Sequence, residues 1–153
     1  MKTRLLWDIP ASAIVLPLQS KNMFDAMDEL VPRALHDSGK IFQNCDHIAK
    51  TIREALQSGF AEHFDRVAII KQSVAGLKET RLAIGIAPDG IASTRQSQIP
   101  PFVLLLCLLA EDSLSHHISS YERRKFCDER TVYKLRTALD AKSVLRALKE
   151  GPA

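Results

Sequence analysis

The apolar positions in the first third of the chain recur every three or four residues, the spacing of an amphipathic helix. Asn22 can cap such a helix and Gly39 can end it, while Pro32 removes a backbone donor inside it and predicts a kink or a break. A second helix is expected to begin near residue 44 or 46 and to stop at Gly59. The two patterns rest on Phe24, Met27, Leu30, Val31, Ala34, Leu35, Ile48, Ile52, Ala55 and Leu56.

The middle of the chain changes to short runs that are rich in β-branched residues. Residues 67–70 and 82–86 predict two neighbouring strands, and the turn Pro88-Asp89-Gly90 closes the second one. Residues 102–109 are almost continuously aliphatic, which is typical of a strand buried on both faces, so we expect them at the centre of the sheet. An earlier β-branched run, residues 13–18, predicts one more strand.

The last third returns to helical spacing. Ser113, Asp128 and Asp140 can each cap a helix, and cations at 123–125 suit the end of the first one. The residues expected to face inward are Leu114, Ile118, Tyr121, Val132, Leu135, Leu139, Val144, Leu145 and Leu148. The order strand, two helices, three strands and three helices predicts an α/β fold: one layered domain over residues 1–153, with a mixed β-sheet flanked by helices.

Composition agrees with such a domain. Hydrophobic residues make up 46% of the 153 residues and charged residues 25%, which excludes a disordered chain and allows one sizeable core. The longest apolar run has nine residues (102–110), far fewer than the roughly 20 of a membrane-spanning helix. Asp8 and Pro10 interrupt the first apolar stretch before a signal-peptide core can form. We therefore expect a cytoplasmic protein that does not insert into membranes.

The chemistry-bearing residues do not form a familiar catalytic or metal motif. Cys45, Cys107 and Cys127 include no pair at Cys-x-x-Cys spacing, so reduced and mostly buried thiols are predicted. No phosphate-binding glycine loop, nucleophile elbow, zinc-protease motif or dinucleotide fingerprint is present. Neither a metal nor a cofactor is expected.

The charge is uneven along the chain. The net charge of +3 is too small to indicate nucleic-acid binding by itself. A basic C-terminal surface is nevertheless predicted, which we interpret as the solvated outer face of helices, with an acidic partner protein or nucleic acid as alternatives. Its residues are Arg123, Arg124, Lys125, Arg130, Lys134, Arg136, Lys142, Arg146 and Lys149.

Several segments, taken in order, resemble one known family. They are Arg53-Glu54-Ala55, Val67-Ala68-Ile69, Gly76-Leu77-Lys78-Glu79, residues 82–91, residues 104–111, His117-Ile118 and Ala141-Lys142-Ser143. In this order and spacing they resemble the enzyme IIA domains of the bacterial phosphotransferase system, of the fructose, mannitol and nitrogen-regulatory type. The resemblance covers almost the whole chain and implies the fold of those domains. In the family, a histidine at a strand end accepts a phosphoryl group and passes it on.

The chain departs from the family pattern where that chemistry takes place. Aligned on Val67-Ala68-Ile69, the proline and the reactive histidine of the pattern fall on Ile70 and Lys71, and its arginine falls on Ser73. The Gly-x-Gly that precedes the strand falls on residues 64–66, which are Phe, Asp and Arg. We expect these bulky and charged residues to replace a flexible glycine loop near the phosphate.

Two histidines remain as candidate phosphoryl acceptors. His117 resembles a second histidine that some of these domains place beside the reactive one. We therefore expect a remnant pocket made of Lys71, Ser73, Glu111 and His117. His63, in the altered loop, is the other candidate, although a surface or packed imidazole is the ordinary role of both.

These observations favour a regulatory or protein-interaction domain that does not carry phosphate, because the ammonium of Lys71 has no lone pair for attack. Its expected partner is a protein, either a component of the phosphotransferase system or a regulated kinase or transporter. One alternative is an active phosphocarrier of a sugar phosphotransferase system that uses His117 or His63. A weaker alternative is a basic adaptor that contacts nucleic acid, although the arginines lack interleaved aromatic residues.

Overall fold

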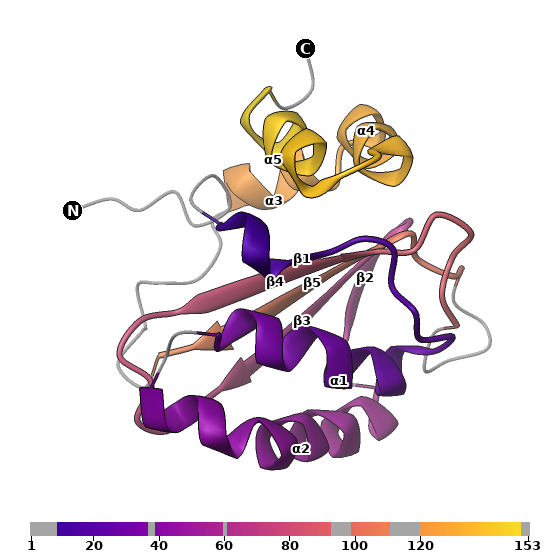
Figure 1. Cartoon of the computed structure of the whole chain (residues 1–153). Coiled ribbons are helices and arrows are strands. Elements are labelled where there is room, and N and C mark those ends of the chain that lie inside the picture. The colour runs from indigo at the N-terminus through magenta and orange to yellow at the C-terminus, as the bar shows by residue number, and fades with distance from the viewer. Residues whose placement is uncertain (1–8, 37–38, 60, 93–98, 111–119, 151–153) are drawn as a thin grey trace.

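The computed structural model describes residues 9–36, 39–59, 61–92, 99–110 and 120–150, with side chains at 123–150 in the last range. Five strands form one mixed sheet that lies between two helical layers (Figure 1). Helices α1 and α2 cover one face of the sheet, and α3, α4 and α5 cover the other. The architecture is the three-layer α/β arrangement that the sequence predicts.

The strands are β1 (Ile14–Val15), β2 (Glu62–Phe64), β3 (Val67–Ser73), β4 (Arg81–Ile86) and β5 (Val103–Leu109). Their order across the sheet is β1-β4-β5-β3-β2, so β5 is the central strand as predicted. The pairs β1 with β4 and β3 with β5 are parallel. The pairs β4 with β5 and β2 with β3 are antiparallel.

The first helical layer follows the predicted periodicity. In α1 (Met23–Ala34), Asn22 caps the helix, because its Oδ1 accepts a hydrogen bond of 2.8 Å from the backbone N–H of Asp25. The α-helix continues through Pro32 without a break and ends at Ala34, five residues before the predicted end. A short 3₁₀ helix then leads into α2 (Cys45–Gln57).

The second helical layer consists of α3 (Ser120–Phe126), α4 (Glu129–Thr137) and α5 (Ala141–Glu150). Asp128 Oδ1 accepts a hydrogen bond of 2.9 Å from the N–H of Arg130, and Asp140 Oδ1 accepts one of 2.8 Å from the N–H of Ser143. Both predicted N-caps are therefore confirmed. The predicted cap Ser113 lies outside the described residues, as do Leu114 and Ile118.

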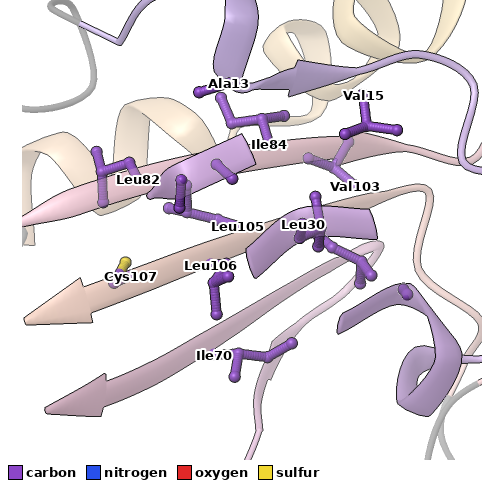
Figure 2. Close-up of a cluster of buried hydrophobic side chains, with 14 of the residues drawn as sticks. Ala13, Val15, Leu30, Ile70, Leu82, Ile84, Val103, Leu105, Leu106 and Cys107 are labelled. Atoms are coloured by element: carbon purple, nitrogen blue, oxygen red, sulfur yellow. The ribbon is translucent and has the colours of Figure 1, made fainter. Parts of the chain in front are cut away.

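The buried apolar side chains form one cluster that runs through the sheet into both helical layers. Figure 2 shows part of it: Ile70 and Leu106 share one face of the sheet, and Ile84 and Leu105 share the other. Cys45 and Cys107 are buried in this core, and all three cysteines are free thiols, as predicted. Among the described residues, none of the helices is long and apolar enough to cross a membrane.

Three further sequence-based expectations are wrong. Strands β3 and β4 are not neighbours, because β5 inserts between them and pairs with both. The segment before β3, expected to be a loop, contains β2, a three-residue edge strand too short and polar to show a strand pattern. Leu139, expected in the core, is 93% exposed because α4 ends at Thr137 and leaves it in the connection to α5.

Candidate functional site

The candidate site lies where β3 leaves the core. The first four residues of this strand are buried, Lys71 and Gln72 are partly exposed, and Ser73 is exposed. Strand β3 runs parallel to β5, so the C-terminal ends of both strands meet at one edge of the sheet. The structure thus places Lys71 and Ser73 together at the C-terminal end of β3, where polar side chains can reach solvent.

Lys71 of β3 forms an ion pair with Glu62 of the neighbouring edge strand, β2. The antiparallel register puts Glu62 of β2 opposite Ile69, on the same face of the sheet as Lys71, because side chains two residues apart share a face. The Nζ atom of Lys71 lies 3.6 Å from Oε1 of Glu62. The side chain of Lys71 is 27% exposed and that of Glu62 is 49% exposed, so this pair is partly solvated. Sequence reasoning missed Glu62, because its proximity depends on the pairing of β2.

The sheet beneath the ion pair offers no nucleophile. Cys107 is the register partner of Lys71 on β5 and is 1% exposed. Burial raises the pKa of the Cys107 thiol to about 12, even though the nearby charge of Lys71 acts to lower it. Cys107 is therefore a protonated core residue.

The other predicted members of the site fall in different places. Glu111 and His117 lie outside the described residues. His63 lies on β2 opposite Ala68, so its side chain is on the opposite face of the sheet from Lys71. The structure therefore does not bring His63 to Lys71.

The turn at residues 64–66 is a tight hairpin connection between β2 and β3. Asp65 has a φ of 57°, a left-handed conformation that Asp tolerates better than most residues. Arg66 anchors the turn, because its Nη1 donates a hydrogen bond of 2.9 Å to the carbonyl of Pro100 and its guanidinium lies 4.6 Å from the ring centre of Phe102. Lys71 is five residues beyond Arg66 along the extended chain, about 17 Å away. The expectation that this turn lies near the site is wrong, because an extended strand separates the two.

An open groove of about 240 Å³ adjoins the end of β3 on the side of α2. His47 and Thr51 of α2 line one wall, and Gln72 and Ser73 line another. The remaining lining residues are Ile41, Asn44, Ile48, Val74 and Ala75. Sequence reasoning missed this groove, since its walls come from segments about 25 residues apart.

The chemistry available at this edge is binding by charge and hydrogen bonds. A lysine ammonium donates three hydrogen bonds and has no lone pair, so Lys71 can hold a carboxylate or phosphate but cannot attack phosphorus in this state. Within the described part of the chain, no three His, Cys, Asp or Glu side chains are grouped to hold a metal ion. Lys71 can thus bind an anion by charge but supplies no nucleophile itself.

No protein-family model and no curated protein matches the chain. Solved structures do match its fold. The nitrogen regulatory protein IIA-Ntr from Neisseria meningitidis has a TM-score of 0.78 at 18% identity, over 95% of this chain and 99% of that chain. Enzyme IIA for mannitol from Escherichia coli has a TM-score of 0.69 at 12% identity, over 92% of this chain and 99% of that chain.

A third match comes from the complex of enzyme IIAMtl and phosphorylated enzyme IIBMtl of Escherichia coli. Its TM-score is 0.70 at 12% identity, over 94% of this chain and 98% of that chain. The chain therefore has the fold of the phosphotransferase-system IIA domains, and the fold predicted from the sequence is confirmed.

Proposed function

We propose that this chain is a regulatory or protein-interaction domain of the enzyme IIA type that does not carry a phosphoryl group. The observation that carries the proposal is Lys71, at the end of β3 in a IIA-type fold, with its ammonium 3.6 Å from the carboxylate of Glu62. When the family pattern is aligned on Val67-Ala68-Ile69, its reactive histidine falls on this position. A scaffold that keeps the fold and lacks the nucleophile retains a docking surface without the transfer step.

Phosphoryl transfer to a protein histidine needs a neutral imidazole nitrogen and donors that stabilise the phosphoryl oxygens. Lys71 supplies no free lone pair, and Ser73 stands where the family pattern has an arginine. The arginine nearest in sequence before Ser73 is Arg66, which is bound to Pro100 and Phe102 at the other end of β3. These features support loss of the carrier function.

The partner that we propose is a protein of the phosphotransferase system or a kinase or transporter that such a system regulates. The solved complex of enzyme IIAMtl with phosphorylated enzyme IIBMtl is an example of a domain with this fold engaged by a protein. A cytoplasmic location is part of the proposal, since the three cysteines are free thiols and suit a reducing compartment.

A phosphoryl-transfer assay tests the proposal. The chain is incubated with enzyme I, histidine phosphocarrier protein and phosphoenolpyruvate that carries a labelled phosphate, and acid-labile, base-stable label is counted per chain. We expect no label on this chain, while IIA-Ntr from Neisseria meningitidis in the same mixture serves as the positive control. Stoichiometric labelling would overturn the proposal.

Two variants separate the alternatives if label does appear. H63N removes the acceptor on β2 and H117N removes the acceptor that the family resemblance indicates. Loss of label in one of these variants would identify the histidine that accepts the phosphoryl group and would support the alternative of an active phosphocarrier. The interaction part is tested by titrating the unphosphorylated chain against histidine phosphocarrier protein and an enzyme IIB domain. We expect binding that K71E weakens, and absence of binding to either protein would count against it.

A further inference from the structure

The outward faces of α4 and α5 form a second distinctive surface, which we call the α4–α5 surface. It comprises Tyr133 of α4, Leu139 of the connection between the helices, and Lys142, Arg146 and Lys149 of α5, with the half-buried Leu145 beside them. Helix α4 buries Thr131, Val132 and Leu135, and at about 100° per residue Tyr133 points to the opposite side. Tyr133 is 65% exposed and Leu139 is 93% exposed. Two large apolar side chains, one on α4 and one in the connection to α5, are thus presented to solvent.

Helix α5 supplies the cations of this surface. It buries Val144, Ala147 and Leu148, while Lys142, Arg146 and Lys149 follow one another at intervals of four and three residues on the opposite side. These three side chains, with Leu145 and Glu150, line an open groove of about 410 Å³. The row of cations extends over about 10 Å of helix.

Within the described part of the chain, none of Lys142, Arg146 and Lys149 is held in a direct ion pair, although the carboxylate of Asp140, just before α5, interacts electrostatically with Lys142 and Arg146. In contrast, Lys134 of α4 pairs with Glu150 at 3.5 Å.

Charge is also segregated within the molecule as a whole. Residues 123–150 carry nine basic and four acidic side chains, a net charge of +5. The rest of the chain has twelve basic and fourteen acidic side chains, a net charge of −2. The outer helical layer is therefore the positive side of the protein.

We infer that the α4–α5 surface docks an acidic amphipathic helix of a partner protein. Carboxylates spaced by three or four residues on that helix would face the cations of α5, and its apolar side chains would cover Leu139, Leu145 and Tyr133. Exposed aromatic, apolar and Arg side chains within one patch are typical of protein interfaces. A row of three cations with Leu145 at its side offers little to a nucleic-acid backbone, which needs longer cation arrays and gains nothing from aliphatic contacts.

A second copy of this chain fits the surface less well. The acidic residues of α1 are already occupied, because Asp28 pairs with Arg53 and Glu29 accepts hydrogen bonds from the backbone N–H groups of Gln19 and Ser20. The inference does not rest on the proposed function, since the α4–α5 surface points away from the sheet that carries Lys71. The same surface would be exposed if this chain did carry a phosphoryl group.

The test measures binding of a labelled helical peptide of about 16 residues to the full chain by fluorescence anisotropy. The peptide has Glu on one face and Leu beside it, and a scrambled peptide of equal composition is the comparison. We expect the patterned peptide to bind at least about tenfold more tightly, and added salt to weaken it. Equal affinity for both peptides would overturn the inference, as would tighter binding of duplex DNA or of vesicles containing phosphatidylglycerol at the same salt concentration.

The triple variant K142E/R146E/K149E is expected to weaken the patterned peptide by at least about tenfold. The matched control K40E/K50E/K78E reverses three exposed cations elsewhere and should change the affinity by less than about twofold, because it alters only the long-range field. The single variant L139S tests the apolar contact without altering charge and is expected to weaken binding while leaving the circular dichroism spectrum unchanged. An equal loss in the control triple variant, or no loss in L139S, would contradict a surface of mixed chemistry.

Discussion

Lys71 and Glu62 lie on neighbouring antiparallel strands at the end of the sheet, with Nζ 3.6 Å from Oε1. Because both side chains are partly exposed, we expect E62Q to lower the free energy of unfolding by less than about 1 kcal/mol. Urea denaturation measures the change, and E54Q on the exposed face of α2 is the control. A loss above about 2 kcal/mol would show that the pair has a structural role that partial solvation does not explain.

Restoring histidine at the end of β3 is expected to recover little phosphoryl transfer. In K71H the imidazole would stand after Ile70 and near Ser73, without the proline and the arginine of the family pattern. Few donors would then stabilise the phosphoryl oxygens, so labelling well below one phosphoryl group per chain is expected. The double variant K71H/S73R should carry more label than K71H. Full labelling of K71H alone would show that the remaining surroundings are already competent.

The N-caps of α4 and α5 make stability depend on pH. Hydrogen bonds from the N–H groups of Arg130 and Ser143 lower the pKa values of Asp128 and Asp140 below their ordinary value. A lowered folded-state pKa stabilises the fold above the unfolded pKa of about 3.9, and this stabilisation is lost as pH falls through the folded-state pKa.

The double variant D128N/D140N keeps both acceptor oxygens and removes their titration. We therefore expect it to lose less stability than the wild-type chain between about pH 7 and pH 3, measured by urea denaturation at each pH. Parallel pH profiles for the two proteins would contradict a role for these carboxylates in acid unfolding.

Gly85 of β4 lies against Leu18 in the segment that precedes α1. A Cβ atom added there would lie 2.7 Å from Cδ1 of Leu18, whose backbone N–H also donates to the carbonyl of Ile86. We expect G85A to lower the free energy of unfolding by about 1–3 kcal/mol through overpacking. In an L18A background the same substitution should cost less, because the clash is removed. Equal losses of unfolding free energy from G85A in the wild-type and L18A backgrounds would exclude the contact with Leu18 as the cause.

Arg136 connects α4 to the sheet. Its Nε donates a hydrogen bond of 2.7 Å to the carbonyl of Pro88, and its guanidinium lies 3.9 Å from the ring centre of Phe102. We expect R136A to lower the free energy of unfolding by about 1–3 kcal/mol, and a cycle with F102L to show coupling. R124A on the exposed face of α3 should change it by less than about 0.5 kcal/mol. Similar effects of R136A and R124A would contradict a specific contact.

Features that depend on a few consecutive residues were predictable. Asn22, Asp128 and Asp140 cap helices because the capping oxygen and the N–H group that it accepts from are two or three residues apart. The aliphatic run of β5 indicated its central place because burial on both faces leaves no polar alternation. The edge strand β2 was not predictable, since its three residues form a strand only by pairing with β3.

The sequence by itself determined the kinds of elements, their order apart from β2, and the absence of a histidine at position 71, because these depend on local spacing and residue identity. Only the tertiary structure decided that β5 separates β3 from β4, that Glu62 faces Lys71 and that His63 points to the other face. Strand pairing joins residues distant along the chain, and a strand's register sets which face each side chain occupies.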